Sequence, residues 1–197
     1  RSEEGSQGEL WLATEAGIAK FDGRRIVVAD KNEGAPRASI YDIKKDKEGV
    51  LWAGTDLGAL TYQAGRWSRF APGGRVEIDK SVMHLAPLRA GGMLIAASTG
   101  VYLWNGAKLE MLHDERTRTL GQAKEIFEDS LGAIWISTYA RGFFYATNGV
   151  LARIAVPETD NPPFVRSIVE RPDGVHLATP LGVHRIELKS GRVAPAL

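Results

Sequence analysis

The chain has 197 residues, of which 44% are hydrophobic and 25% are charged, as is usual for a globular domain. Its 25 Lys and Arg residues balance 24 Asp and Glu residues without a basic block, so we expect no nucleic-acid partner. Cysteine is absent, which excludes disulfides, zinc–thiolate sites and a cysteine nucleophile. No apolar run approaches the roughly 18 residues of a membrane-spanning helix, so we also expect no direct membrane contact, and the printed residues hold no secretory leader.

One glycine-led motif recurs along the whole chain. It reads Gly-x-apolar-Trp-apolar-x-Thr at residues 8–14, 49–55 and 132–138, and it returns in weaker form at residues 92–98 and 174–179. The opening glycines stand at positions 8, 49, 92, 132 and 174, so the steps are 41, 43, 40 and 42 residues. A period of this size is typical of a repeat architecture.

Each repeat reads as four short strands. An alternating segment precedes the motif from the second copy on, at residues 39–44, 82–87, 122–127 and 164–169. The motif is the second strand, and two more alternating segments follow, joined by Gly-containing hairpin turns such as Asp22-Gly23 and Asn105-Gly106. Four strands per repeat predict an all-β chain, a β-propeller with about five four-stranded antiparallel blades. As one domain or fragment over residues 1–197, it has approximate blade bounds 1–34, 35–78, 79–119, 120–161 and 162–197.

The recurring side chains have a structural interpretation. Trp11, Trp52 and Trp135 share one register, in which the weaker copies place Ile95 and Leu177, and a large flat ring there would fill the space between neighbouring blades. A hydroxyl ends the same strand and can bond a nearby backbone group; the residues are Thr14, Thr55, Ser98, Thr138 and Thr179.

The first blade stands out by what precedes it. Residues 1–7 are polar and too short for a strand and a turn, so we predict that the first blade lacks its innermost strand. The chain would then be part of a larger propeller of about six or seven blades. The alternatives are a five-bladed ring with a defective blade, or closure by a partner chain.

Candidate ligand-binding residues lie where the copies differ. Counting eight residues back from each opening glycine gives a register that is polar in every blade yet different in each, made of Tyr41, His84, Lys124 and Arg166. The loop after the motif adds Asp56, Tyr139 and Arg141, with Glu15 and Thr99 at related positions. An Arg beside a Tyr can hold a carboxylate or stack on a sugar ring. The alternative is that these side chains meet only water.

We predict no metal site, cofactor or catalytic residue. The run at residues 113–118 contains a His and acids but no second His at ligand spacing, and residues 160–163 read as a rigid turn.

The motif resembles the two-component regulator propeller repeats. That family's pattern of Asp-x-x-Gly, apolar-Trp-apolar-x-Thr and a Gly-containing turn is matched at residues 46–55 and 129–138. The third copy lacks the Asp and the Trp, and the fifth is a residue short. The resemblance implies a sensor module, periplasmic or otherwise outside the bacterial membrane, that feeds a histidine kinase, a diguanylate cyclase or a transcription regulator. The family's motif residues are scaffold, so it implies no catalytic or ligand residues.

The sequence therefore favours a non-catalytic ligand-sensing or interaction propeller of a bacterial two-component or cyclic-dinucleotide signalling protein. A small molecule or carbohydrate, a protein partner or a second copy of the chain could bind it. A propeller-fold lyase or glycosidase acting on a carbohydrate is the alternative, for which Glu15 and Asp56 would be the carboxylates. A structural or dimerisation propeller is the third possibility.

Overall fold

The computed structural model describes residues 1–5, 8–29, 33–75, 78, 80–113, 120–139, 141–147, 150–154, 165–187 and 193–195. Apart from turns and loops, the elements that we describe are strands and one short 3-10 helix, η2 (Pro72–Gly74). In chain order the strands are β1 (Ser2–Glu4), β2 (Leu10–Thr14), β3 (Gly17–Phe21), β4 (Ile26–Val28), β5 (Ile40–Lys45), β6 (Leu51–Thr55), β7 (Gly58–Gln63), β8 (Arg66–Arg69), β9 (Val82–Pro87), β10 (Met93–Ala97), β11 (Gly100–Trp104), β12 (Leu109–Met111), β13 (Ala123–Glu128), β14 (Ile134–Thr138), β15 (Phe143–Thr147), β16 (Val150–Ile154), β17 (Ser167–Arg171), β18 (Gly174–Thr179), β19 (Gly182–Ile186) and β20 (Val193–Pro195).

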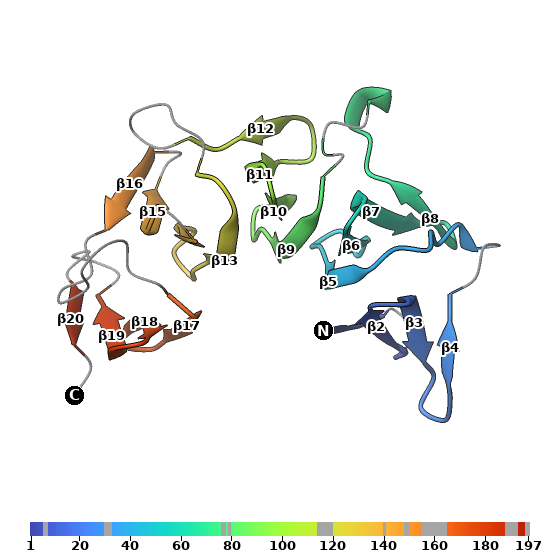
Figure 1. The fold of residues 1–197 in the computed structure, drawn as a ribbon, viewed down its shortest axis with the longest axis horizontal. Coiled ribbons are helices and arrows are strands. Elements are labelled where there is room, and N and C mark those ends of the chain that lie inside the picture. Colours follow the sequence, from blue (N-terminus) through green and yellow to red (C-terminus); the bar gives the residue numbers. More distant parts are fainter. Residues whose placement is uncertain are drawn as a thin grey trace. The chain divides into compact units, whose positions relative to one another are not determined.

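The strands form five four-stranded sheets, and in every sheet the order across the sheet follows the order along the chain. We number these sheets blades 1 to 5, from β1–β4 to β17–β20. In Figure 1 each blade is a group of successive colours, such as the blue β2, β3 and β4 of blade 1. The predicted all-β fold, with four strands in meander order per repeat, is therefore confirmed.

The chain divides into two compact units. The amino-terminal unit holds residues 1–98 and 102–110, and the carboxy-terminal unit holds residues 99–101 and 111–197. Blades 1 and 2 and most of blade 3 belong to the first unit, and blades 4 and 5 belong to the second. No helix among the described residues is long or apolar enough to cross a membrane. The predicted run at residues 113–118, apart from His113, and the predicted turn at residues 160–163 lie outside the described residues.

The prediction that blade 1 lacks its innermost strand is wrong. β1 pairs with β2, and Glu3 lies opposite Trp11. The turn between them is closed by a hydrogen bond of 2.7 Å from Gly5 N to Glu9 O, and bonds of 2.9 Å close the same turn in blades 2 and 4. Only the middle residue of β1 is half-buried, so a polar three-residue segment can pair there without an apolar pattern. Burial raises the pKa of Glu3, while Lys44 and Lys45 oppose this effect.

A carboxylate in the first turn of the blade holds the motif tryptophan. Asp46 Oδ2 accepts the Nε1–H of Trp52 at 2.7 Å, and Asp129 Oδ2 accepts that of Trp135 at 2.8 Å. The other oxygen of each carboxylate accepts a backbone N–H of the turn. We call this arrangement the carboxylate–indole clasp. Because the carboxylate bonds both the turn and the next strand, it fixes the turn and the orientation of the ring together.

Variants of the clasp occur in blades 1 and 5. In blade 1 the Nε1–H of Trp11 donates to Glu9 Oε1 at 3.1 Å. In blade 5 His176 Nε2 lies 2.9 Å from Asp173 Oδ1. A turn carboxylate therefore contacts a ring nitrogen even where glutamate replaces the aspartate or histidine replaces the tryptophan.

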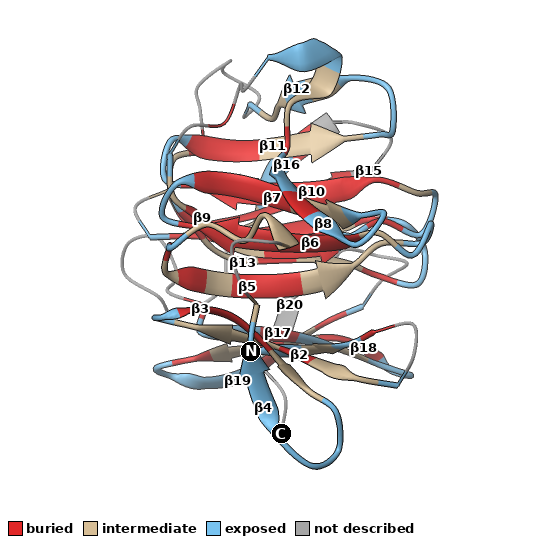
Figure 2. Cartoon of the chain, turned by 90° about the vertical axis from the view of Figure 1, so that its right-hand side faces the viewer, coloured by how far each residue is buried: buried red, intermediate tan, exposed pale blue. Residues whose placement is uncertain are grey.

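The tryptophans fill the space between neighbouring blades, as predicted. Trp11 packs with residues of blade 2 such as Ile43, and Trp52 packs with residues of blade 3 such as Leu85. In the carboxy-terminal unit Trp135 packs with Leu177 of blade 5. Figure 2 shows that β4, the outermost strand of blade 1, is exposed along its length.

The motif hydroxyls close the turn after β2, β6, β14 and β18. Each donates to the carbonyl of the following glycine at 2.7–3.1 Å, and the residues are Thr14, Thr55, Thr138 and Thr179. The predicted bond to a nearby backbone group is confirmed in these four blades. In blade 3 the register holds Ala97 rather than Ser98, because Ala97 pairs with Val82 as Thr55 pairs with Ile40.

The register of the weaker copies differs from the prediction in the same way. The turn of blade 3 opens at Gly91, whose N–H donates to Leu88 O at 3.0 Å as Gly49 N does to Asp46 O at 3.1 Å. Leu94, not Ile95, therefore takes the tryptophan register in blade 3. In blade 5 His176, not Leu177, lies opposite Val169 and Arg185 in the positions that pair with the tryptophan elsewhere.

Candidate functional site

The inner strands of blades 2, 3 and 4 share a β-bulge at one position. In β5 the ladder passes from Ile40, opposite Thr55, to Asp42, opposite Gly54, so Tyr41 has no residue opposite it. Met83 of β9 and Lys124 of β13 stand at the same point of their ladders. A bulge bends the strand and redirects the extra side chain. Tyr41 and Lys124, two of the residues selected from the sequence, therefore stand at a distinct structural position.

His84 does not share the register of Tyr41, contrary to the predicted alignment. It lies opposite Ala96, in the position that Asp42 holds opposite Gly54. Two consecutive glycines caused the error, because counting back from Gly92 rather than Gly91 lands one residue too late. The bulge position of blade 3 is apolar, so the register is not polar in every blade.

Asp42 is a charged residue of the inner strands that sequence reasoning missed. Its side chain is fully buried, and Oδ2 accepts a hydrogen bond from Arg1 Nη1 at 2.8 Å and one from Leu85 N at 3.0 Å. The carboxylate thus links β5 to β9 and to Arg1, the residue before β1. The available signal was an aspartate inside a predicted strand, one residue before an apolar position.

Lys124 and Arg166 form a pair of like charges in the carboxy-terminal unit. Burial lowers the pKa of Lys124, the positive charge of Arg166 lowers it further, and Glu125 opposes both. Arg166 N donates to Ala178 O at 2.7 Å, immediately before the ladder of β17 begins at Ser167. A lysine whose positive charge is disfavoured by an arginine of the neighbouring blade is suited to an anionic ligand.

We expect the Arg166→Gln variant to raise the pKa of Lys124. In the parent protein the pKa of Lys124 lies below its ordinary value of 10.5, so the unfolded state binds more protons and stability rises as the pH climbs from the lowered pKa to 10.5. Below the lowered pKa the folded protein bears the full free-energy cost of the charged Lys124. The variant should narrow the pH interval between the lowered pKa and 10.5. An NMR titration of the Lys124 side chain measures the shift, and an unchanged pKa would contradict the electrostatic effect of Arg166 on Lys124.

The loop of blade 4 holds Tyr139 and Arg141. Tyr139 is 53% exposed, and its N–H donates to Gln122 O at 3.2 Å. Arg141 is half-buried, and its N–H donates to Thr138 Oγ1 at 3.0 Å. The backbone N–H of each of these two residues is thus held by a hydrogen bond.

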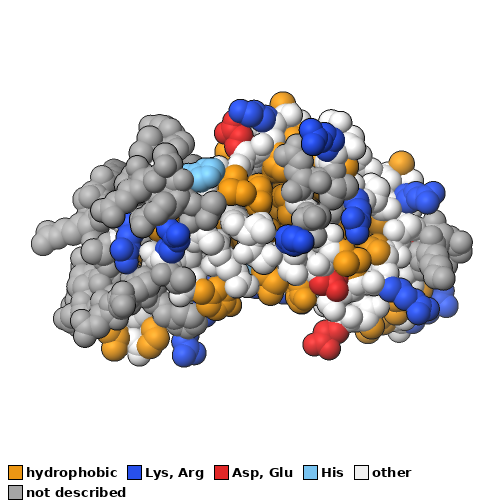
Figure 3. All heavy atoms as spheres, turned by 45° about the horizontal axis from the view of Figure 1, so that its top comes forward, with side chains coloured by type: hydrophobic (Ala, Val, Ile, Leu, Met, Phe, Trp, Pro, Cys, Tyr) orange, Lys and Arg blue, Asp and Glu red, His pale blue; other side chains and the backbone are white. Residues whose placement is uncertain are grey.

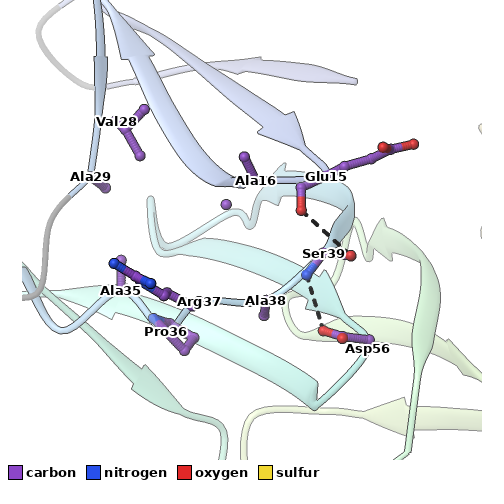
Figure 4. Close-up of a pocket in the computed structure, with 11 residues that line it drawn as sticks. Glu15, Ala16, Val28, Ala29, Ala35, Pro36, Arg37, Ala38, Ser39 and Asp56 are labelled. Atoms are coloured by element: carbon purple, nitrogen blue, oxygen red, sulfur yellow. Dashed lines mark hydrogen bonds between the residues drawn. The ribbon is translucent and has the colours of Figure 1, made fainter.

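Asp56 lines a pocket between the loops of blades 1 and 2, which we call the loop pocket. Its volume is about 700 Å³, and Glu15, Arg37 and Ser39 also line it. Asp56 Oδ1 accepts the N–H of Ser39 at 3.1 Å, whereas Figure 4 shows the carboxylate of Glu15 directed away from the other lining residues. The structure thus brings both predicted loop carboxylates to one pocket without directing them at one point.

The predicted site residues are divided between the two units. Tyr41, Asp56 and His84 belong to the amino-terminal unit, and the other four belong to the carboxy-terminal unit; these are Lys124, Tyr139, Arg141 and Arg166. Among the described residues, no group of three or more His, Asp or Glu side chains is placed to hold a metal ion. On the face shown in Figure 3, the Lys and Arg side chains of the described part of the chain are scattered rather than gathered in one patch.

Comparison with solved structures shows the fold. The chain aligns with the extracellular domain of BT4673 from B. thetaiotaomicron, a protein named as a hybrid two component system, at a TM-score of 0.79 and 21% identity, over 99% of this chain and 27% of that chain. It aligns with virginiamycin B lyase from Staphylococcus aureus at a TM-score of 0.72 and 12% identity, over 99% of this chain and 68% of the lyase. For PorZ of Porphyromonas gingivalis, a component of the type-IX secretion system, the TM-score is 0.72, the identity is 16%, and the coverage is 99% and 33%.

The chain thus spans about a quarter of the length of the BT4673 domain that it matches, 27%. Comparison with curated protein sequences finds no match. Residues 34–56 match the family model of the two component regulator propeller. This segment includes β5, the Asp46 turn and β6, where the carboxylate–indole clasp of blade 2 lies. The chain is therefore an all-β protein of propeller blades that carries a two component regulator propeller repeat.

Proposed function

We propose that this chain is a non-catalytic ligand-sensing propeller of a bacterial two-component or cyclic-dinucleotide signalling protein, and that it acts in the periplasm. The repeat at residues 34–56 and the likeness to an extracellular domain of a hybrid two component system support this proposal. The fold alone does not select a function, because unrelated functions occur on one fold and depend on the side chains of the site.

The observation that carries the proposal is the repeated bulge with a different side chain in each blade. The backbone geometry recurs at Tyr41, Met83 and Lys124, while the side chains change from phenol to thioether to ammonium. In the clasp, by contrast, the chemistry is kept even where the residue type changes, because a carboxylate contacts a ring nitrogen in blades 1, 2, 4 and 5. A constant geometry with varied side chains favours ligand recognition, and within the carboxy-terminal unit the positive charges of Lys124 and Arg166 favour an anionic ligand.

The second candidate is a lyase, favoured by the fold likeness to virginiamycin B lyase. The loop pocket is its candidate site. The two carboxylates of the loop pocket are not arranged as a paired acid and base. Asp56 accepts the N–H of Ser39, and the Glu15 carboxylate points away from the other lining residues. Turnover that is lost in an Asp56→Asn variant would favour the lyase over the sensor.

The sensor proposal is tested with two sugars that differ by one carboxylate. Galacturonate should raise the melting temperature of the protein, whereas galactose should not, because only galacturonate can pair with Lys124 and Arg166. A double variant, K124Q with R166Q, should lose the response. A Lys47→Gln variant is the matched control, since Lys47 is exposed in the turn of blade 2 and should leave the response unchanged. In the full-length protein the double variant should also abolish the ligand-dependent output. Equal responses to both sugars, or a response that survives the double variant, would contradict the proposed site.

A further inference from the structure

An internal ammonium group occupies an aromatic site between blades 1 and 2. Lys20 Nζ lies 4.3 Å from the ring centroid of Trp11 and 5.5 Å from that of Tyr62. It also forms an ion pair of 2.9 Å with Glu33 Oε1. Burial lowers the pKa of Lys20, but the hydrogen bond and charge of Glu33, together with Tyr62, outweigh burial and raise it. This interface therefore stabilises a cation.

The interface between blades 2 and 3 repeats the aromatic side chains without the lysine. Trp52 corresponds to Trp11, and the residue opposite it is Thr61, where Lys20 lies opposite Trp11. Trp104 corresponds to Tyr62, because each is the fifth residue of a strand that begins at the glycine after the motif turn. Thr61 is too short to cover the rings as Lys20 does.

A pocket of about 440 Å³ lies at this position, and we call it the aromatic pocket. Three aromatic rings line it. The ring centroids of Trp52 and Phe70 are 4.7 Å apart, and those of Phe70 and Trp104 are 5.2 Å apart at an interplanar angle of 74°. The rings therefore follow one another around the pocket instead of stacking into a single layer.

The charge around the aromatic pocket is negative. The carboxylates of Asp46 and Glu48 line it, together with the amides of Gln63 and Asn105, and the described lining residues include neither Lys nor Arg. Asp46 is held in place by the Nε1–H of Trp52, so its charge lies at the edge of one of the rings. Aromatic faces together with fixed carboxylates are the features that select organic cations.

The carboxy-terminal unit shows the position filled in another way. Tyr145 lies opposite Trp135, and the two ring centroids are 4.5 Å apart. The residue opposite the tryptophan thus fills the space with an ammonium group in blade 1 and with a ring in blade 4. In blade 2 the shorter Thr61 stands at this position and lines the aromatic pocket.

We propose that the aromatic pocket between blades 2 and 3 binds a small organic ammonium ion, whose head takes the place over Trp52 that Lys20 Nζ takes over Trp11. This site lies apart from Lys124 and Arg166, and it takes the opposite charge. It would give the protein a second ligand class beyond the anionic ligand of the proposed function.

Choline and its neutral isostere 3,3-dimethyl-1-butanol test the proposal. The two have the same shape, so the expected preference for choline, about tenfold in Kd, measures the contribution of the charge. Titration calorimetry gives both affinities, and tryptophan fluorescence should change with choline because Trp52 and Trp104 line the pocket.

Variants at position 61 locate the site. Thr61→Lys places an ammonium group where Lys20 has one and should weaken choline binding by about tenfold or more, the range of a lost cation–π site. Thr61→Val is the matched control of equal size, and it should bind choline as the parent does. Circular dichroism melts establish that both variants are folded.

The K124Q and R166Q double variant should keep choline binding, which separates this proposal from the proposed function. Absence of choline binding to the folded parent protein, equal binding of the neutral isostere, or parental affinity in Thr61→Lys would each overturn the proposal.

Discussion

Replacing Asp129 with alanine should lower the free energy of unfolding by about 3–5 kcal/mol, the range for breaking a buried charged network. The Asp129 side chain is fully buried and accepts hydrogen bonds from Leu131 N, Ala133 N and Trp135 Nε1 at 2.8–2.9 Å. The alanine variant leaves the buried indole N–H and the Ala133 N–H without these acceptors. Chemical denaturation measures the loss, and hydrogen exchange should place it in blades 4 and 5.

Asp46→Ala is the matched control for this prediction. Asp46 makes the same bonds to Val50 N and Trp52 Nε1, but it is half-buried, so water can replace part of what is lost. Its cost should be smaller, about 1–2 kcal/mol. If the two variants lose equal stability, burial is not what makes the clasp of blade 4 the stronger one.

Gly92→Ala should also lower the free energy of unfolding by about 3–5 kcal/mol, because the costs of backbone strain and of steric overlap add. Gly92 has a φ of +93°, which an L side chain rarely adopts. An added Cβ would also lie well inside contact distance of the carbonyl oxygen of Trp104, which belongs to the backbone and cannot rotate away. Thermal and urea unfolding measure the loss.

Gly91→Ala separates the two causes. Gly91 has a φ of +101°, but an added Cβ would meet only the carboxylate end of Glu48, at 2.8 Å, which can move aside. This variant should therefore show the conformational strain alone, about 1–2 kcal/mol. A loss in Gly92→Ala no larger than that in Gly91→Ala would mean that the strand around Trp104 yields at little cost.

The blade architecture could be predicted because it is encoded locally. A glycine for the turn, an aspartate that bonds the turn and a tryptophan that reaches the next blade all lie within ten residues, as at Asp46 to Thr55. Local encoding also explains two wrong predictions, the absence of β1 and the register of blade 3. β1 carries no apolar pattern because it is mostly exposed, and the pair Gly91-Gly92 offers two registers between which the sequence alone does not choose.

The candidate site was harder to predict because it depends on residues from different repeats. The position of Tyr41 and Lys124 could be found by counting along the motif, yet the buried Asp42 is defined by Arg1 and by Leu85 N, each about one repeat away. The aromatic pocket depends on a missing side chain. Its lining combines Thr61, a short residue opposite Trp52, with the Trp104 ring of the next blade, and periodicity in one strand does not report such a combination.

The meander order of every sheet has a consequence for synthesis on the ribosome. Proteins rich in β-structure usually fold slowly, because their strands pair across long stretches of chain. Here each described sheet joins four strands that follow one another directly, beginning with β1 at the amino terminus. A blade can therefore complete its hydrogen bonding as soon as its own residues have emerged, and the motif tryptophans of blades 1, 2 and 4 then need only the next blade for their packing. The nascent chain can mature by successive addition of blades, so each of these indole faces is exposed only until the following blade has formed.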